Sequence, residues 1–73
     1  MQGYYVIKNK KQVKDFLKKT RIKTQKNLAD IIGIGEDYMS QIMNGKPTTK
    51  VTAYAMCKAI SSNLEIENIF EIF

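Results

Sequence analysis

Five polar side chains lie close together in residues 36–44 and are the group best able to recognise a ligand. They are Glu36, Asp37, Ser40, Gln41 and Asn44. Side chains of these types hydrogen-bond the edges of nucleic-acid bases: an amide pairs twice with adenine, a carboxylate accepts from cytosine, and a hydroxyl donates or accepts. A short helix that carries them on one face would present them together to a major groove.

The helical period indicates which face of residues 36–43 is exposed. The apolar side chains are Met39, Ile42 and Met43. At about 100° per residue from Glu36, they average about 290°, so the solvent face centres at about 110°. Asp37, Gln41 and Asn44 fall near that centre, Ser40 is next, and Glu36 and Tyr38 lie at the two margins.

Catalytic chemistry is not expected. The chain has no histidine and a single cysteine, so it offers neither the usual general base nor a cluster of metal ligands. Glu36 and Asp37 are adjacent and point about 100° apart on a helix, so they cannot easily cooperate. We expect no enzyme activity, metal, cofactor or small-molecule ligand, and we expect Cys57 to be a buried core thiol.

Positive charge is concentrated at the front of the chain. The formal net charge is +5, with nine Lys or Arg against one Asp in residues 1–26, a balanced middle, and three Glu in residues 64–73. Such a field attracts polyanions such as a phosphate backbone. A solvated lysine-rich face that only maintains solubility explains the charge equally well.

Length and composition set the organisation. Seventy-three residues allow one domain, residues 1–73, whose thin core gives only marginal stability. No apolar run approaches the roughly 20 residues that cross a bilayer. The lone cysteine and the absence of a secretory signature predict a protein of the cytoplasm without membrane association.

Apolar periodicity predicts short helices separated by tight turns. They cover residues 10–20, 25–32, 36–43 and 50–60, with a last short helix over residues 64–70. Asn9, Thr24 and Thr48 or Thr49 are expected N-caps, and Gly33 the left-handed C-cap. Ile31 and Val51 are counted among the core-facing positions.

The predicted fold is all-α, a compact bundle of four or five crossed helices. The β-favouring run Tyr4–Ile7 is too short to form a sheet alone, and its one candidate partner is the tail Ile69–Phe73. A short strand pairing of the N- and C-terminal segments is therefore part of the prediction.

The region 24–45 resembles the helix-turn-helix of the Cro/repressor regulators of phage and bacteria, the XRE family. The features that carry the resemblance are Thr24-Gln25, Leu28-Ala29, Gly33-Ile34, Tyr38-Met39-Ser40-Gln41-Ile42 and Asn44-Gly45-Lys46, and the similarity covers roughly residues 10–70. It implies a lambda-repressor-like domain of phage or prophage origin. Such a domain binds double-stranded DNA in a sequence-specific way and regulates transcription, with helix 36–43 in the major groove.

The resemblance also implies residue roles. Residues matching Glu36, Asp37, Ser40, Gln41 and Asn44 meet the bases. The DNA backbone is held by those matching Thr24, Gln25, Tyr38, Lys46, Thr49 and Lys50. Elementary chemistry supports the roles of Gln25, whose amide donates to phosphate oxygen, and of the two lysines, which neutralise phosphate.

Several alternatives stay open. Glu36 and Asp37 suit the positive end of a helix whether or not they touch bases. Tyr38 either packs on the sugar or covers the helix flank, and the lysines of residues 10–20 either act through a long-range field or merely solvate their helix. The chain is expected to bind its operator as a homodimer, because one such helix reads few base pairs. The rival function is an antitoxin-like adaptor that binds other proteins through the apolar tail Ile66–Phe73.

Overall fold

Side-chain caps determine where three of the helices begin. In the computed structural model, which describes residues 3–73, the Asn9 carboxamide oxygen accepts from the backbone N–H groups of Lys11 and Gln12 at 3.0 and 3.3 Å, which starts α1 (Lys10–Lys18). The Thr24 hydroxyl accepts from the N–H of Asn27 at the start of α2 (Gln25–Ile32). Thr49 caps α4 (Lys50–Ile60) in the same way. These caps satisfy N–H groups that a helix cannot pair internally.

Backbone reversals determine where helices end. Gly33 closes α2 with a φ of 80°, the left-handed conformation that favours glycine. α3 (Glu36–Met43) begins after Gly35. α1 ends at Lys18, two residues before the predicted end, because the Thr20 hydroxyl donates to the Leu17 carbonyl at 2.9 Å and Lys23 turns the chain at a φ of 66°.

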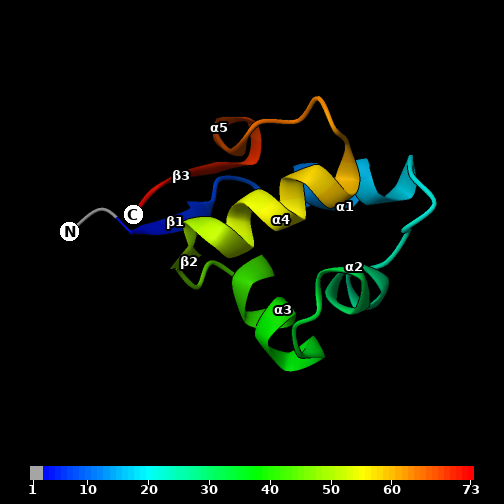
Figure 1. Ribbon diagram of the computed structural model, residues 1–73, viewed down its shortest axis with the longest axis horizontal. Helices are drawn as coiled ribbons and strands as arrows, with labels where there is room; N and C mark the ends of the chain where they lie inside the picture. Colours follow the sequence, from blue (N-terminus) through cyan, green and yellow to red (C-terminus); the bar gives the residue numbers. More distant parts are fainter. Residues whose placement is uncertain (1–2) are drawn as a thin grey trace.

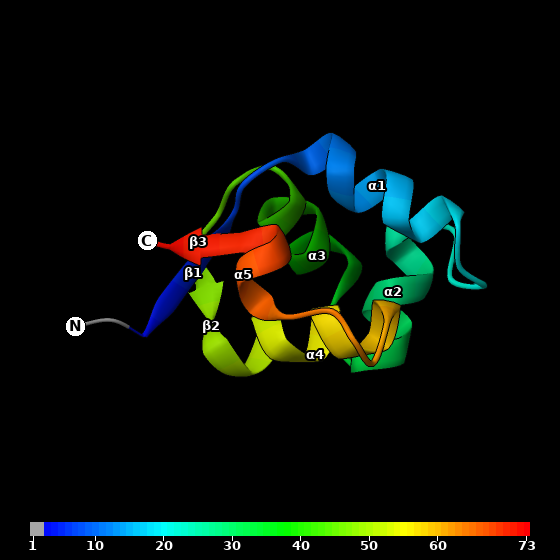
Figure 2. The ribbon, with the colours of Figure 1, turned by 90° about the horizontal axis from the view of Figure 1, so that it is seen from above.

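A three-stranded antiparallel sheet joins the two ends of the described chain (Figures 1 and 2). Its strands are β1 (Tyr4–Ile7), β2 (Thr48–Thr49) and β3 (Phe70–Ile72), in the order β2-β1-β3. Tyr5 pairs with Ile72 and Ile7 with Phe70, which confirms the predicted pairing of the N-terminal run with the tail. β2 was not predicted, so the molecule is mostly helical rather than all-α.

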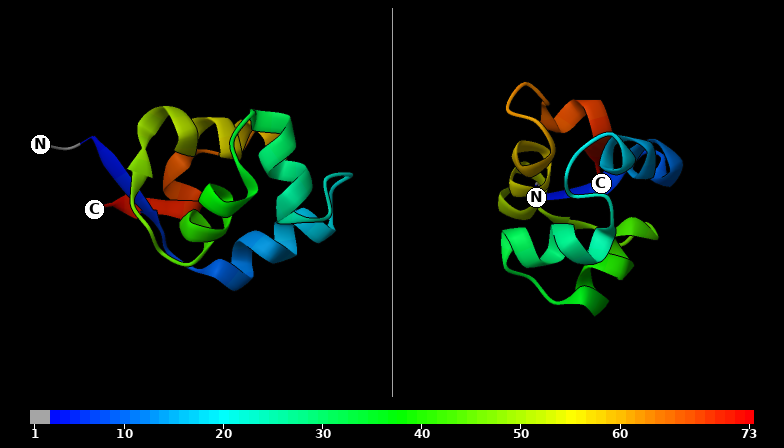
Figure 3. Two further views of the ribbon diagram at one scale, coloured as in Figure 1. Left: turned by 90° about the horizontal axis from the view of Figure 1, so that it is seen from below. Right: turned by 90° about the vertical axis from the view of Figure 1, so that its right-hand side faces the viewer.

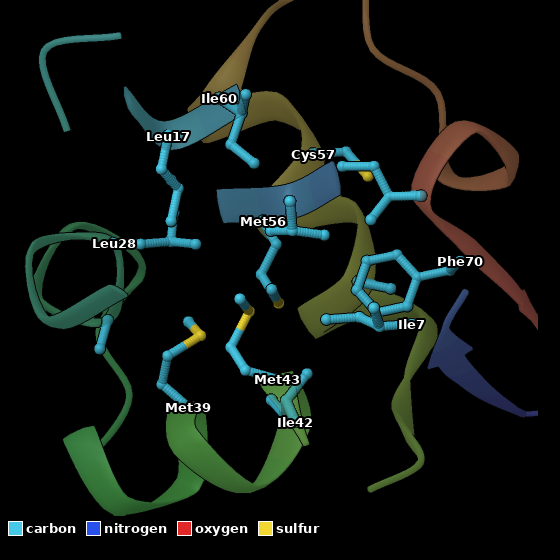
Figure 4. Packing of buried hydrophobic residues seen from close by; sticks show 14 of the residues in the cluster. Ile7, Leu17, Leu28, Met39, Ile42, Met43, Met56, Cys57, Ile60 and Phe70 are labelled. Carbon is cyan, nitrogen blue, oxygen red and sulfur yellow. The ribbon is translucent and has the colours of Figure 1, made fainter. Parts of the chain in front are cut away.

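The core lies between the sheet and the helices (Figure 4). Fully buried side chains come from every helix and from β3; the largest are Phe70, Leu17, Leu28, Met39, Ile42, Met43, Met56 and Ile69. Two predicted core positions are wrong, because Ile31 is 58% exposed and Val51 is 80% exposed. Their helices turn small residues inward instead: Ala29 and Ala53 are completely buried, and α2 and α4 pack against each other.

The remaining helix, α5 (Ile66–Ile69), is a single turn that leads into β3. It lies on the opposite side of the molecule from α3 (Figures 1 and 3). No helix within residues 3–73 has both the length and the apolar character needed to cross a bilayer.

Candidate nucleic-acid interface

α2 and α3 form a unit in which a three-residue turn, residues 33–35, joins two packed helices. The N–H groups of Gly33 and Ile34 both donate to the Ala29 carbonyl, at 2.9 and 3.0 Å. Ile34 packs against the core from the turn. These contacts hold α3 at one orientation relative to α2, so the outward face of α3 is held by the body of the protein.

The faces of α3 are as the helical period predicts. Met39 and Ile42 have no exposed surface and Met43 is 2% exposed. Most of the polar candidates are exposed, namely Glu36, Asp37, Gln41 and Asn44, while Ser40 is half-buried. The structure therefore brings the five candidate base-contacting residues onto one outward surface, with Ser40 the most deeply set.

Gln41 and Lys46 are paired with each other. The Lys46 ammonium donates to the Gln41 carboxamide oxygen at 2.8 Å and lies 5.5 Å from the centre of the Tyr38 ring. An amide that pairs twice with adenine uses both its oxygen and its N–H₂ group. The oxygen has a second lone pair, so Gln41 can engage a base while Lys46 still holds it.

Tyr38 is anchored to the body of the protein. Its hydroxyl lies 2.8 Å from the Thr48 hydroxyl, and Thr48 is only 1% exposed. The pair joins the flank of α3 to the short strand β2. This contact supports the flank-covering interpretation of Tyr38, and it places the ring beneath the Lys46 ammonium.

Lys10 is a residue that sequence reasoning missed. Its ammonium donates to the Asn44 carboxamide oxygen at 2.7 Å, which joins the start of α1 to the end of α3. The two residues are 34 positions apart, and no local spacing signals such a contact. Asn44, a candidate base contact, is therefore hydrogen-bonded to a lysine from another helix.

Comparisons of the chain with protein-family models, curated proteins and solved structures find no match.

The residues predicted to contact the DNA backbone include one pair at the start of α2 and another at the start of α4. Thr24 and Gln25 lie at the start of α2, beside a hollow of about 230 Å³ that is also lined by Lys14, Lys18 and Lys23. The hydroxyl of Thr24 is already engaged as the cap of α2, and Gln25 is half-buried.

Lys50 is set apart from this basic region. It lines a larger hollow together with the acidic residues of the chain's end, Glu65, Glu67 and Glu71. Thr49, next to it, is exposed and caps α4. Of the two lysines that the resemblance assigns to the DNA backbone, Lys46 stands with α3, whereas Lys50 faces negative charge.

Cys57 lies in the core, as the sequence predicts. Its side chain has no exposed surface, and its thiol lies 3.7 Å from the Glu65 carbonyl oxygen. Burial raises the pKa of the Cys57 thiol to about 11, against the opposing effect of Lys58. Within residues 3–73, no group of three or more His, Cys, Asp or Glu side chains is placed to hold a metal ion.

Proposed function

We propose that this chain binds double-stranded DNA in a sequence-specific way and regulates transcription, with α3 in the major groove. The arrangement of α2, the turn and α3 would then be a helix-turn-helix in a lambda-repressor-like domain of phage or prophage origin. The observation that carries the proposal is that α3 has one buried apolar face and one exposed polar face. One face is sealed in the core, and the other presents Asp37, Gln41 and Asn44 to solvent.

Charge supports the same orientation. Lys46 lies with α3, and Lys14, Lys18 and Lys23 lie beside Gln25. By contrast α5 and β3, which carry two Glu, lie away from α3 (Figure 1). A phosphate backbone approaching α3 therefore avoids the acidic end of the chain and meets these lysines beside the two carboxylates of α3, Glu36 and Asp37. Glu36 and Asp37 make no hydrogen bond among the described residues, so both carboxylates are available to accept from cytosine N4.

Selection of bound duplexes from a random pool, repeated at two salt concentrations, tests the proposal. A shared sequence motif should emerge, and overall retention should fall steeply as salt rises, because phosphate binding releases counterions. Recovery of no duplex at low salt would reject DNA binding. Recovery of duplexes without any shared motif would reject base recognition by α3.

A homodimer is the proposed binding form, because α3 spans only eight residues and contacts few base pairs. Its proposed contact is the end of the sheet. Ile72 and Phe73 are 65% and 74% exposed there, and the Phe73 N–H donates to the Tyr4 carbonyl. Since alternate residues of an edge strand point their backbone groups outward, the N–H and C=O of Ile72 point away from β1 and suit a second strand.

The same exposed apolar end favours the second candidate function, an adaptor that binds other proteins. The two functions differ in their response to salt. DNA binding weakens steeply with ionic strength, whereas apolar association does not. A chain that retains no duplex but captures a protein partner at high salt would be the adaptor.

A further inference from the structure

The lysines of α1 are arranged in a row that borders the α2–α3 unit. Lys10, Lys14 and Lys18 follow one another at intervals of four residues, which places them on one face of the helix. We call them the α1 lysine row. Seen from below, α1 runs along one side of α2 and α3 (Figure 3, left).

Both ends of the α1 lysine row meet residues of the candidate interface. At one end, the Lys10 ammonium is hydrogen-bonded to Asn44, at the end of α3. At the other end, Lys14 and Lys18 line the same hollow as Gln25, at the start of α2. The row therefore spans from one predicted DNA contact to the other.

The loop after α1 is braced so that it completes the basic surface. The Lys23 N–H donates to the Leu17 carbonyl at 3.1 Å, and the Asn27 side chain donates to the Ile22 carbonyl at 2.8 Å. Lys23, in its left-handed backbone conformation, lines the hollow with Lys14 and Lys18. No acidic side chain lines this hollow, and none of its lysines forms an ion pair within residues 3–73.

We infer that the α1 lysine row is a direct contact surface for the phosphate backbone of the duplex, beside the groove that α3 enters. This inference rests on the proposed function and adds to it a surface outside the α2–α3 unit. From Lys10 to Lys18 the helix rises about 12 Å. That rise equals the axial length of three to four phosphates of one strand, at about 3.4 Å each.

The chain contains its own matched control. Lys11 of α1 and Lys19, the C-cap residue of that helix, line a different hollow together with Asp15. The test variant is Lys14→Gln with Lys18→Gln, and the control variant is Lys11→Gln with Lys19→Gln. Each variant removes two positive charges from a formal net charge of +5, at exposed positions.

The measurement is fluorescence anisotropy with a labelled duplex, from about 20 to about 200 mM KCl. We expect the test variant to lower the slope of log affinity against log salt by about 1.8, since each phosphate contact contributes about 0.9. Its affinity at 0.1 M salt should fall roughly 10- to 60-fold, and the control variant should keep the slope of the unmodified chain within about 0.3. Lys14→Arg with Lys18→Arg should keep the unmodified slope, because the charge is retained.

Equal slopes for the test and control variants would overturn the inference, whether both are unchanged or both are lowered, because a long-range field does not distinguish the two faces of α1. Thermal unfolding of both variants checks that they are folded. If the unmodified chain binds no duplex, the proposed function fails and this inference fails with it. Duplex binding with equal slopes rejects the α1 contact alone.

Discussion

If the proposed function is correct, some side chains of the candidate interface distinguish bases and others only attract phosphate. Gln41 stands on the exposed face of α3, and its amide oxygen accepts a hydrogen bond from Lys46. The charge of Lys46 would attract phosphate equally in a duplex of any base sequence. The two neighbours should therefore respond differently to removal, although they touch each other.

We predict that Gln41→Ala reduces the preference for the selected duplex over a random one by about 1–3 kcal/mol, since it removes a base contact. Lys46→Ala should weaken binding to both duplexes alike and lower the salt slope by about 0.9. Competition binding with the two duplexes measures both effects. Gln12→Ala, on the exposed surface of α1, is the matched control and should change neither. Equal losses on both duplexes for Gln41→Ala would exclude a base-recognition role.

The buried Cys57 thiol predicts a loss of stability in alkali. Its pKa rises from an ordinary 9.0 to about 11 because burial disfavours the thiolate, so the unfolded chain loses the proton at lower pH than the folded one. Stability is therefore complete below about pH 9 and declines toward pH 11.

Chemical unfolding at pH 8 and pH 11 measures this decline. We expect the free energy of unfolding to fall by on the order of 2 kcal/mol more in the unmodified chain than in Cys57→Ala. All other side chains are the same in the two proteins, so the comparison isolates the effect of Cys57. The same alkaline decline in both proteins would show that Cys57 is not protected by burial.

At the scale of elements, the turn between α2 and α3 controls how α3 is presented. Gly33 adopts a φ of 80°, where an added Cβ would meet no atom within 4 Å. The cost of a side chain there is therefore conformational strain rather than collision.

We predict that Gly33→Ala lowers the free energy of unfolding by about 1 kcal/mol, which lowers the melting temperature by roughly 4–8 °C in a domain of this size. Gly35→Ala is the control, because Gly35 also has open space around it but a φ of −68°. Thermal unfolding of the two variants measures the difference. A Gly33→Ala protein as stable as the control would mean that the turn relaxes without strain.

At the scale of the whole molecule, two features affect how copies of the chain could associate. They are the uneven distribution of surface charge and the exposed apolar residues at the end of the sheet. The acidic α5 and β3 lie away from α3, and the apolar Tyr4, Ile72 and Phe73 gather where β1 and β3 pair. In the proposed dimer, a second copy would pair there and leave each α3 exposed.

We predict two copies of the chain per selected duplex, with half-sites about 10 base pairs apart. Ile72→Glu should lower the affinity for the two-site duplex at least tenfold, since it places two negative charges across the proposed contact. Val51→Glu is the control, because Val51 is equally apolar and 80% exposed but lies on α4. Light scattering of the complex gives the stoichiometry. One copy per duplex, or equal losses for both variants, would reject a dimer through β3.

Local sequence by itself determined most of the helices. Asn9, Thr24 and Gly33 act on backbone groups within a few residues, so their effects are visible in the sequence, and the bounds of α2, α3 and α4 agree with the prediction. The exposed face of α3 was predictable for the same reason. Its three apolar side chains repeat with the helical period, and the core buries all three.

Tertiary packing alone decided the rest. Ile31 and Val51 are apolar but exposed, while the smaller side chains of Ala29 and Ala53, on the same two helices, are buried. β2 exists because Thr48 and Thr49 meet β1, which is more than forty residues earlier in the chain. The Lys10–Asn44 bond also joins distant segments. Such contacts depend on how the helices cross, and no local spacing encodes that crossing.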